Sequence, residues 1–110
     1  MTTPVRVLGG LLALALSGLA LASPTPERQQ ALTRLVRDDC GACHGLRLQG
    51  GLGTPLTREA LADKPVDSLV ATVLYGRPGT AMPPWKPFMS EAEARWIIDT
   101  LQAGGLGEAR

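Results

Sequence analysis

The sequence predicts an all-α domain preceded by a signal peptide. Three observations support the all-α class: apolar residues recur every three or four positions, serine, threonine and proline stand where helices would begin, and no segment alternates apolar and polar residues as a half-buried strand does. At 110 residues the chain has room for a single domain. We therefore expect three to four helices around one core.

The first 22 residues have the three parts of a secretory signal. Arg6 precedes an uncharged run of mostly Leu, Ala and Gly at 7–21, and Ala20-Leu21-Ala22 has the small-x-small pattern of a cleavage site. The run is shorter than the roughly 20 apolar residues that span a bilayer, so an uncleaved membrane anchor is the weaker alternative. We expect residues 1–22 to be removed and residues 23–110 to form a domain in the periplasm, without stable membrane insertion.

Charge and cysteine content exclude several classes of protein. The chain has 11 Lys and Arg against 10 Asp and Glu, and loss of Arg6 with the signal would leave the mature side chains balanced. Such a chain lacks the basic footprint of nucleic-acid binding, so no nucleic-acid partner is expected, and its long-range steering of protein partners should be weak. Two cysteines are too few for a disulfide scaffold.

Four helices are expected in the mature chain, each from a start signal followed by an apolar repeat. Their expected bounds are 26–38, 57–62, 67–75 and 91–103. The first has Thr25 as N-cap and Pro26 at its first position. The last begins with a capping box formed by Ser90 and Glu93. The proline-rich segment 77–88 should remain irregular.

Residues 40–44 read Cys-Gly-Ala-Cys-His, the C-x-x-C-H pattern of covalent c-type haem attachment. On a helical turn Cys40 and Cys43 lie on one face, where both thiols can reach the vinyl groups of one porphyrin edge. His44 is four residues after Cys40, so its imidazole projects from the same face towards the iron. The two cysteines are therefore candidate covalent anchors, and His44 is a candidate axial ligand.

Other uses of two cysteines and a histidine remain open. A structural disulfide is compatible with an exported protein. A thioredoxin-like redox pair normally stands near a β-α-β pattern, which this chain lacks. A zinc site needs four ligands, and there is no second group of Cys or His. A non-haem dithiol or disulfide protein is thus the alternative to haem attachment.

A second axial ligand could come from Met82 or Met89. Met89 stands beside the Ser90 cap, where a hydrophobic staple residue is expected. Met82 lies in a stiff, proline-rich loop between two helices, which can hold a thioether against a cofactor. Ligation by His and Met raises the reduction potential and leaves no open position on the iron, which favours electron transfer over catalysis. Arg77, beside this loop, is a candidate contact for a haem propionate.

Together, the Cys40–His44 motif, the segment Gly79-Thr80-Ala81-Met82-Pro83 and the final amphipathic helix resemble the small class I cytochromes c over residues 26–103. The longer sequence around both motifs, with Gly50-Gly51-Leu52-Gly53 and residues 76–85, looks like that of the NirC-type cytochromes. Cytochromes of this type accompany the periplasmic cytochrome cd nitrite reductase of denitrifying bacteria. The resemblance implies that the first and last helices cross and that one haem c lies in a crevice. It also implies thioether bonds at Cys40 and Cys43 and axial ligation by His44 and Met82.

The function implied is a periplasmic mono-haem electron carrier in denitrification, not an enzyme. We expect a monomer whose partners are redox proteins, with the cytochrome cd nitrite reductase and its haem-maturation proteins as candidates. The alternative within the same system is an assembly factor for the nitrite reductase haem. Because the mature chain is short and rich in loops, we also expect it to be largely unfolded without its cofactor.

Overall fold

The computed structural model describes residues 1–5, 9–10 and 23–107, and all regular structure in this part is helical. The elements are α1 (Pro26–Leu35), a π-helical turn η1 (Val36–Cys40), α2 (Gly41–His44), α3 (Arg58–Leu61), α4 (Val66–Tyr75) and α5 (Glu91–Gln102). Because no strand occurs in these residues, the predicted all-α class is confirmed. Fifteen of the 22 residues of the predicted signal segment lie outside the described residues, and the segment stays a prediction.

The first helix begins as expected but continues further than expected. The Thr25 side chain accepts a hydrogen bond from the Arg28 amide at 3.3 Å, and Pro26 occupies the first turn. The expected end at residue 38 is wrong, because η1 and α2 carry the helical path through His44. In η1 the Gly41 amide bonds to the Val36 carbonyl, five residues back, as in a π-helix. The C-x-x-C-H motif therefore lies on a direct continuation of α1.

The last helix begins with the predicted capping box. The Ser90 hydroxyl accepts from the Glu93 amide at 3.1 Å, and the Glu93 carboxylate accepts from the Ser90 amide at 3.0 Å. The other expected helices are present with ends shifted by at most one residue, which is within the usual uncertainty of such bounds.

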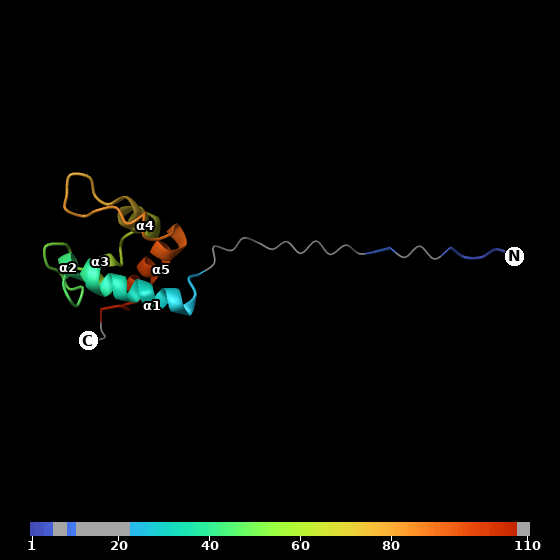
Figure 1. The fold of residues 1–110 in the computed structure, drawn as a ribbon, viewed down its shortest axis with the longest axis horizontal. Helices are drawn as coiled ribbons and strands as arrows, with labels where there is room; N and C mark the ends of the chain where they lie inside the picture. The colour runs from blue at the N-terminus through green and yellow to red at the C-terminus, as the bar shows by residue number, and fades with distance from the viewer. Residues whose placement is uncertain (6–8, 11–22, 108–110) are drawn as a thin grey trace.

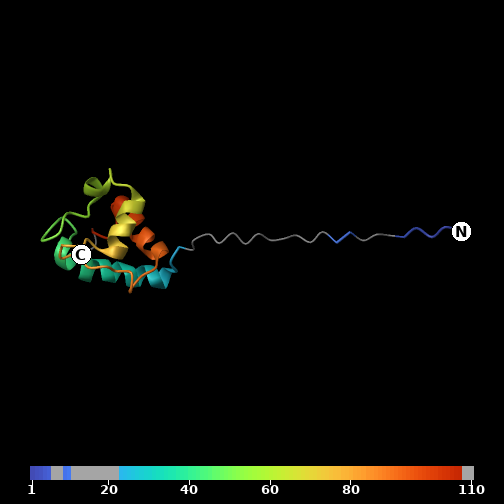
Figure 2. The ribbon, with the colours of Figure 1, turned by 90° about the horizontal axis from the view of Figure 1, so that it is seen from above.

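The terminal helices are in contact, as the resemblance implied, and α4 packs on α5 from another side (Figures 1 and 2). Arg28 on α1 forms an ion pair with Glu93 on α5 and donates to the Phe88 carbonyl at 2.9 Å. Gln102 on α5 donates to the carbonyls of Leu61 and Lys64 at 3.0 Å each. The buried side chains form one core: Leu32, Val36, Leu48, Leu61, Val70, Leu74, Met89, Ala94, Ile97, Ile98 and Leu101.

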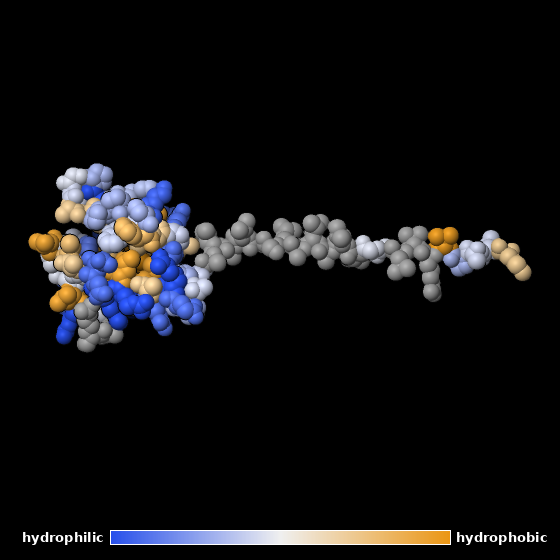
Figure 3. Space-filling view, viewed as in Figure 1, coloured by the Kyte–Doolittle hydropathy of each residue, from blue (hydrophilic) through white to orange (hydrophobic). Residues whose placement is uncertain are grey.

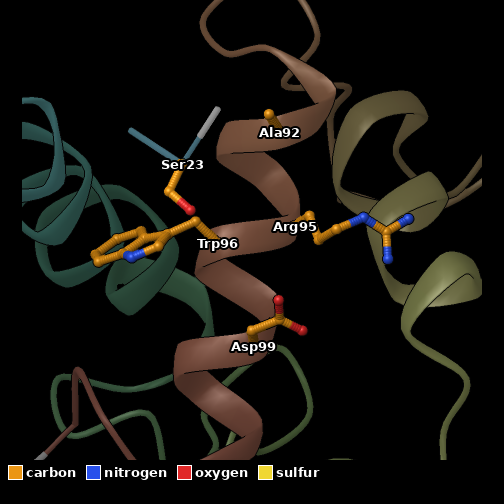
Figure 4. Close-up of a pocket in the computed structure, with 5 residues that line it drawn as sticks. All are labelled: Ser23, Ala92, Arg95, Trp96 and Asp99. Atoms are coloured by element: carbon orange, nitrogen blue, oxygen red, sulfur yellow. The ribbon is translucent and has the colours of Figure 1, made fainter. Parts of the chain in front are cut away.

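A small cavity of about 90 Å³ borders α5 and is lined by Ser23, Ala92, Arg95, Trp96 and Asp99. Figure 4 shows the Trp96 ring projecting towards α1, and Trp96 packs against the core. Arg95 points the other way, towards α4, where it pairs with Asp67 at 2.5 Å. No predicted haem residue lines this cavity.

Within the ranges that the structure describes, no helix is long and apolar enough to cross a membrane.

Candidate haem site

The C-x-x-C-H motif follows the helical path of η1 and α2, where its three functional side chains differ in exposure. Cys40 ends η1 and packs partly against the core, whereas Cys43 is exposed and His44 is half-buried. Both cysteines carry free thiols. The motif thus presents two separate thiols and an imidazole within little more than one helical turn, as attachment to two vinyl groups requires.

The electrostatics of Cys40 fit attachment better than a reactive dithiol. Burial raises the pKa of the Cys40 thiol to about 11, and the neighbouring Asp39 carboxylate adds to the rise. Redox-active and metal-binding cysteines generally have lowered pKa values, because the thiolate is the reactive species. A neutral, partly buried thiol suits conversion to an uncharged thioether, which has no charge to desolvate.

His44 is oriented by a backbone carbonyl. Its Nδ1 lies 2.6 Å from the Thr54 carbonyl oxygen, which can only accept, so Nδ1 carries the proton. The lone pair is then on Nε2, the tautomer that a metal-binding imidazole needs. This donor set fits haem iron, because one nitrogen is held by the protein and the other is free to coordinate.

The glycine-rich loop after the motif holds this carbonyl in place. The Gly53 amide donates to the Cys43 carbonyl at 2.8 Å, and the Gly50 amide donates to the His44 carbonyl at 2.8 Å. At Gly53 a Cβ atom would lie 2.7 Å from His44 Nδ1, closer than real Cβ contacts allow. Glycine is therefore required where the loop backbone passes the imidazole. The sequence alone does not indicate this contact with His44.

Met82 lies in a loop that is tied to α4 at several points. Its carbonyl accepts from the Arg77 amide at 3.2 Å, and the amides of Trp85 and Lys86 donate to the carbonyls of Val73 and Leu74 at 3.0 Å each. Gly76 has φ +67°, and a Cβ there would lie 2.6 Å from the Met82 carbonyl oxygen. The loop thus has little freedom to move Met82.

The two methionines of residues 23–107 have different environments. Met89 is only 6% exposed and belongs to the core, as expected of a staple residue. Met82 is half-buried and lies outside that core cluster. Met82 is therefore the better placed of the two to contact a cofactor, and the exposed Arg77 lies five residues before it.

The motif and the Met82 loop lie at the same end of the domain, to the left in Figure 1, and the rotated view in Figure 2 agrees. Figure 3 shows apolar side chains on the surface at that end, over α2 and the loop that follows it. Leu46 and Leu52, both in this loop, are 68% and 98% exposed. The fold therefore brings the predicted ligand segments together beside exposed apolar side chains.

A second cavity, of about 370 Å³, lies between the glycine-rich loop, the start of α3 and the turn after α5. Arg47, Thr57 and Arg58 are among its lining residues, and none of the predicted haem ligands is.

Comparison with known proteins decides the family. Residues 27–99 match the family model described as cytochrome c oxidase, cbb3-type, subunit III. A cytochrome c55X of Stutzerimonas stutzeri is 58% identical over 87 residues, covering 78% of this chain and 77% of the relative. A solved c-type cytochrome NirC is 55% identical with a TM-score of 0.75, covering 76% of this chain and 99% of that structure.

The chain belongs to the NirC-type c-type cytochromes. The resemblance seen in the sequence is therefore confirmed, and with it the class: a c-type cytochrome that carries electrons rather than an enzyme, with haem c as its cofactor. A dihydro-heme d1 dehydrogenase of Pseudomonas aeruginosa is 33% identical over 86% of this cytochrome but over only 18% of its own length. A cytochrome of this type thus also occurs as part of a larger redox protein.

Proposed function

We propose that this cytochrome is a periplasmic single-haem electron carrier of a nitrite reductase system. Cys40 and Cys43 would hold haem c through two thioether bonds, and His44 and Met82 would coordinate its iron. The observation that carries the proposal is the His44 geometry: Nδ1 is bound to the Thr54 carbonyl, and Nε2 is left free beside two unpaired thiols. Kinship with cytochrome c55X and NirC supports the link to nitrite reduction.

Haem c supplies a one-electron couple, and the remaining contributions come from this chain. The Thr54 carbonyl accepts the Nδ1 proton of His44 and so fixes the imidazole plane and its tautomer. The hydrogen bond from the Arg77 amide to the Met82 carbonyl restrains the backbone that carries the thioether. Arg77 provides a cation for a propionate carboxylate. A fixed ligand environment keeps reorganisation small when an electron enters or leaves.

The decisive experiment is a pyridine haemochrome spectrum of the protein exported to the periplasm, with matched cysteine variants. The wild type should show one haem per chain with both vinyl groups saturated. Cys40→Ser and Cys43→Ser should each show one unreacted vinyl group or lose haem, whereas Ala42→Ser, inside the same motif, should retain full attachment. A wild-type protein without covalent haem would contradict the proposal and favour a dithiol protein.

A second candidate function is that of an assembly factor in maturation of the nitrite reductase haem, and one comparison favours it. One relative, part of which matches this cytochrome, is named a dihydro-heme d1 dehydrogenase. A dehydrogenase must pass the electrons it removes to an acceptor, and its cytochrome-like segment suits that task. A separate cytochrome of the same type could take such electrons during maturation of the reductase haem.

Deletion of the gene separates the two functions. If the cytochrome is a carrier, the deletion strain should make nitrite reductase with its complete haem but reduce nitrite slowly. If the cytochrome serves maturation, purified reductase from that strain should lack mature haem. Both assays use the reductase spectrum and its activity with an artificial donor, which separates haem content from electron supply.

A further inference from the structure

Charged side chains are unevenly divided between the helices and the two segments that flank the haem site. Residues 40–57 carry Arg47 as their one Lys or Arg, and residues 68–90 carry Arg77 and Lys86. Neither segment contains Asp or Glu, so every acidic residue lies elsewhere. Asp39 directly precedes the first segment, and Asp67 and Glu91 directly border the second. The overall balance of charge therefore hides a local excess of cations.

The exposed apolar side chains follow the same division. Within residues 23–107, the large hydrophobic side chains that stand out into solvent are Leu46, Leu52, Tyr75 and Phe88, with exposures from 59% to 98%. All four lie in the two segments that lack acidic residues. We call the surface formed by these four residues with Arg47, Arg77 and Lys86 the two-loop face.

Aromatic contacts on one side of the two-loop face order its side chains. The Lys86 ammonium lies 5.2 Å from the centre of the Tyr75 ring, a cation–π contact that holds the cation against an apolar surface. Phe88 packs against the half-buried Trp85 with ring centres 5.7 Å apart. Both loops lie at the end of the domain that carries the motif, as Figures 1 and 2 show. Aromatic side chains are enriched at binding surfaces.

We propose that the two-loop face docks a redox protein whose own electron-exchange surface has carboxylates around an apolar centre. This inference rests on the proposed electron-carrier function, because it places the partner at the haem end. Leu46, Leu52 and Phe88 supply the apolar contact, and Arg47 and Lys86 supply the charges that attract and orient the partner. Three cations spread over two loops are too few for a nucleic-acid backbone.

The uneven distribution of charged side chains changes the expectation, drawn from the total charge, that long-range steering of partners is weak. A chain with balanced charge but one cationic face has a strong local field, which accelerates association with an oppositely charged surface. Association should therefore depend on salt although the total charge is close to zero. An apolar contact, in contrast, is insensitive to ionic strength at these concentrations. The two contributions can be separated in one experiment.

The test measures electron transfer into the oxidised holo-cytochrome from a reduced flavodoxin, an acidic flavin protein that serves as the probe. Second-order rate constants are taken from about 0.01 M ionic strength, where the Debye length is about 30 Å, to about 1 M, where it is about 3 Å. One variant is Arg47→Glu/Lys86→Glu. The matched control is Arg34→Glu/Lys64→Glu, which changes net charge equally on α1 and after α3. Arg77 is left intact because of its proposed propionate contact.

At low ionic strength the face variant should react about tenfold more slowly than wild type, and the control less than about twofold more slowly. All three should converge at high ionic strength. A further variant, Leu46→Ser/Leu52→Ser, should react more slowly at every ionic strength with an unchanged salt slope. Its haem spectrum reports that the site is intact.

Three results would overturn the docking surface while leaving the carrier function in place. The first is equal slowing of electron transfer by both charge variants, and the second is a wild-type rate constant that does not depend on salt. The third is that the wild type sediments with vesicles of anionic phospholipid and the face variant does not. The last result would show that the face binds a membrane. A chain without a haem spectrum would instead contradict the proposed function itself.

Discussion

Backbone atoms orient the side chains on which haem binding is proposed to depend. The Thr54 carbonyl holds His44, and the Arg77 amide holds the Met82 carbonyl. The sequence indicates His44 and Met82 as candidate ligands because their residue types and spacing are specific. It could not indicate Thr54, because every residue has a carbonyl and only the folded loop shows which one faces the imidazole.

The first prediction at the residue scale concerns Gly53. In Gly53→Ala the new methyl group would meet His44 Nδ1 at 2.7 Å and push the loop away, lengthening the bond to Thr54. The holo-protein should lose about 2 kcal/mol of unfolding free energy, measured by guanidinium titration. Gly41→Ala is the control, because its Cβ would meet only ordinary contacts at 3.6 Å or more. Equal stability of the two variants would show that the close approach is unimportant.

The second concerns the sixth ligand. Met82→Ala should abolish the near-infrared sulfur-to-iron absorption band and lower the reduction potential, because a thioether ligand raises it. Exogenous imidazole should bind more than about tenfold tighter, since it no longer has to displace a ligand. Met89→Leu, a volume-conserving change in the core, should keep the band. Persistence of the band in Met82→Ala would rule out this ligand.

At the scale of elements, the sequence predicted the helix ends to within one residue, except the end of the first helix. The capping box of α5 is readable from Ser90 and Glu93, and it is present. The continuation of α1 through η1 and α2 was missed, because Asp38 and Asp39 are poor helix formers and the C-x-x-C-H pattern gives no sign of a π-turn. The local register there is set by packing of Val36 and Gly41, which are both buried.

The contact between α1 and α5 gives a prediction about pH. Burial alone would raise the pKa of Glu93, but hydrogen bonds from Arg28 and Ser90, with the charge of Arg28, lower it below the ordinary value of 4.5. A lowered pKa in the folded state means that the ionised carboxylate stabilises the fold above the pKa of the unfolded chain. That stabilisation is lost as the pH falls through the lower, folded value.

Glu93→Gln should therefore reduce the unfolding free energy by about 1 kcal/mol at neutral pH. The difference from wild type should shrink as the pH falls below 4.5, the value for an unperturbed glutamate. Denaturant titrations at a series of pH values measure this difference. Glu91→Gln, an exposed acidic residue in the same first turn, is the control and should have a smaller effect at neutral pH. A difference that grows on acidification would contradict the assigned direction.

At the scale of the whole molecule, the composition predicts that the fold depends on a cofactor. It does not predict how the charges are arranged in space. A core of eleven mostly aliphatic side chains serves a chain with long irregular connections. Total charge predicted little, because it does not show that the cations of residues 40–57 and 68–90 lie at one end of the domain. The order of residues along the chain predicted the separate helices and loops. Only the folded structure shows that the C-x-x-C-H motif and the Met82 loop lie at the same end of the domain.

The chain without haem should accordingly lose its fixed tertiary structure. Cys40→Ser/Cys43→Ser, which removes both anchors, should show weak near-ultraviolet dichroism and a non-cooperative thermal transition, while retaining part of the far-ultraviolet helical signal. The holo wild type is the reference and should unfold cooperatively. Native-like near-ultraviolet dichroism with sharp unfolding in the haem-free variant would show that the protein core suffices.

The bond between His44 and a main-chain carbonyl has a consequence for how this cytochrome tolerates mutation. Because no side chain at position 54 takes part, many residue types there leave the imidazole oriented, and random mutagenesis with selection for haem content should return a broad mixture at 54. Position 53, one residue earlier, should return glycine almost alone. Neighbouring positions of one loop would thus differ sharply in the residues that they accept, although both lie against the same imidazole.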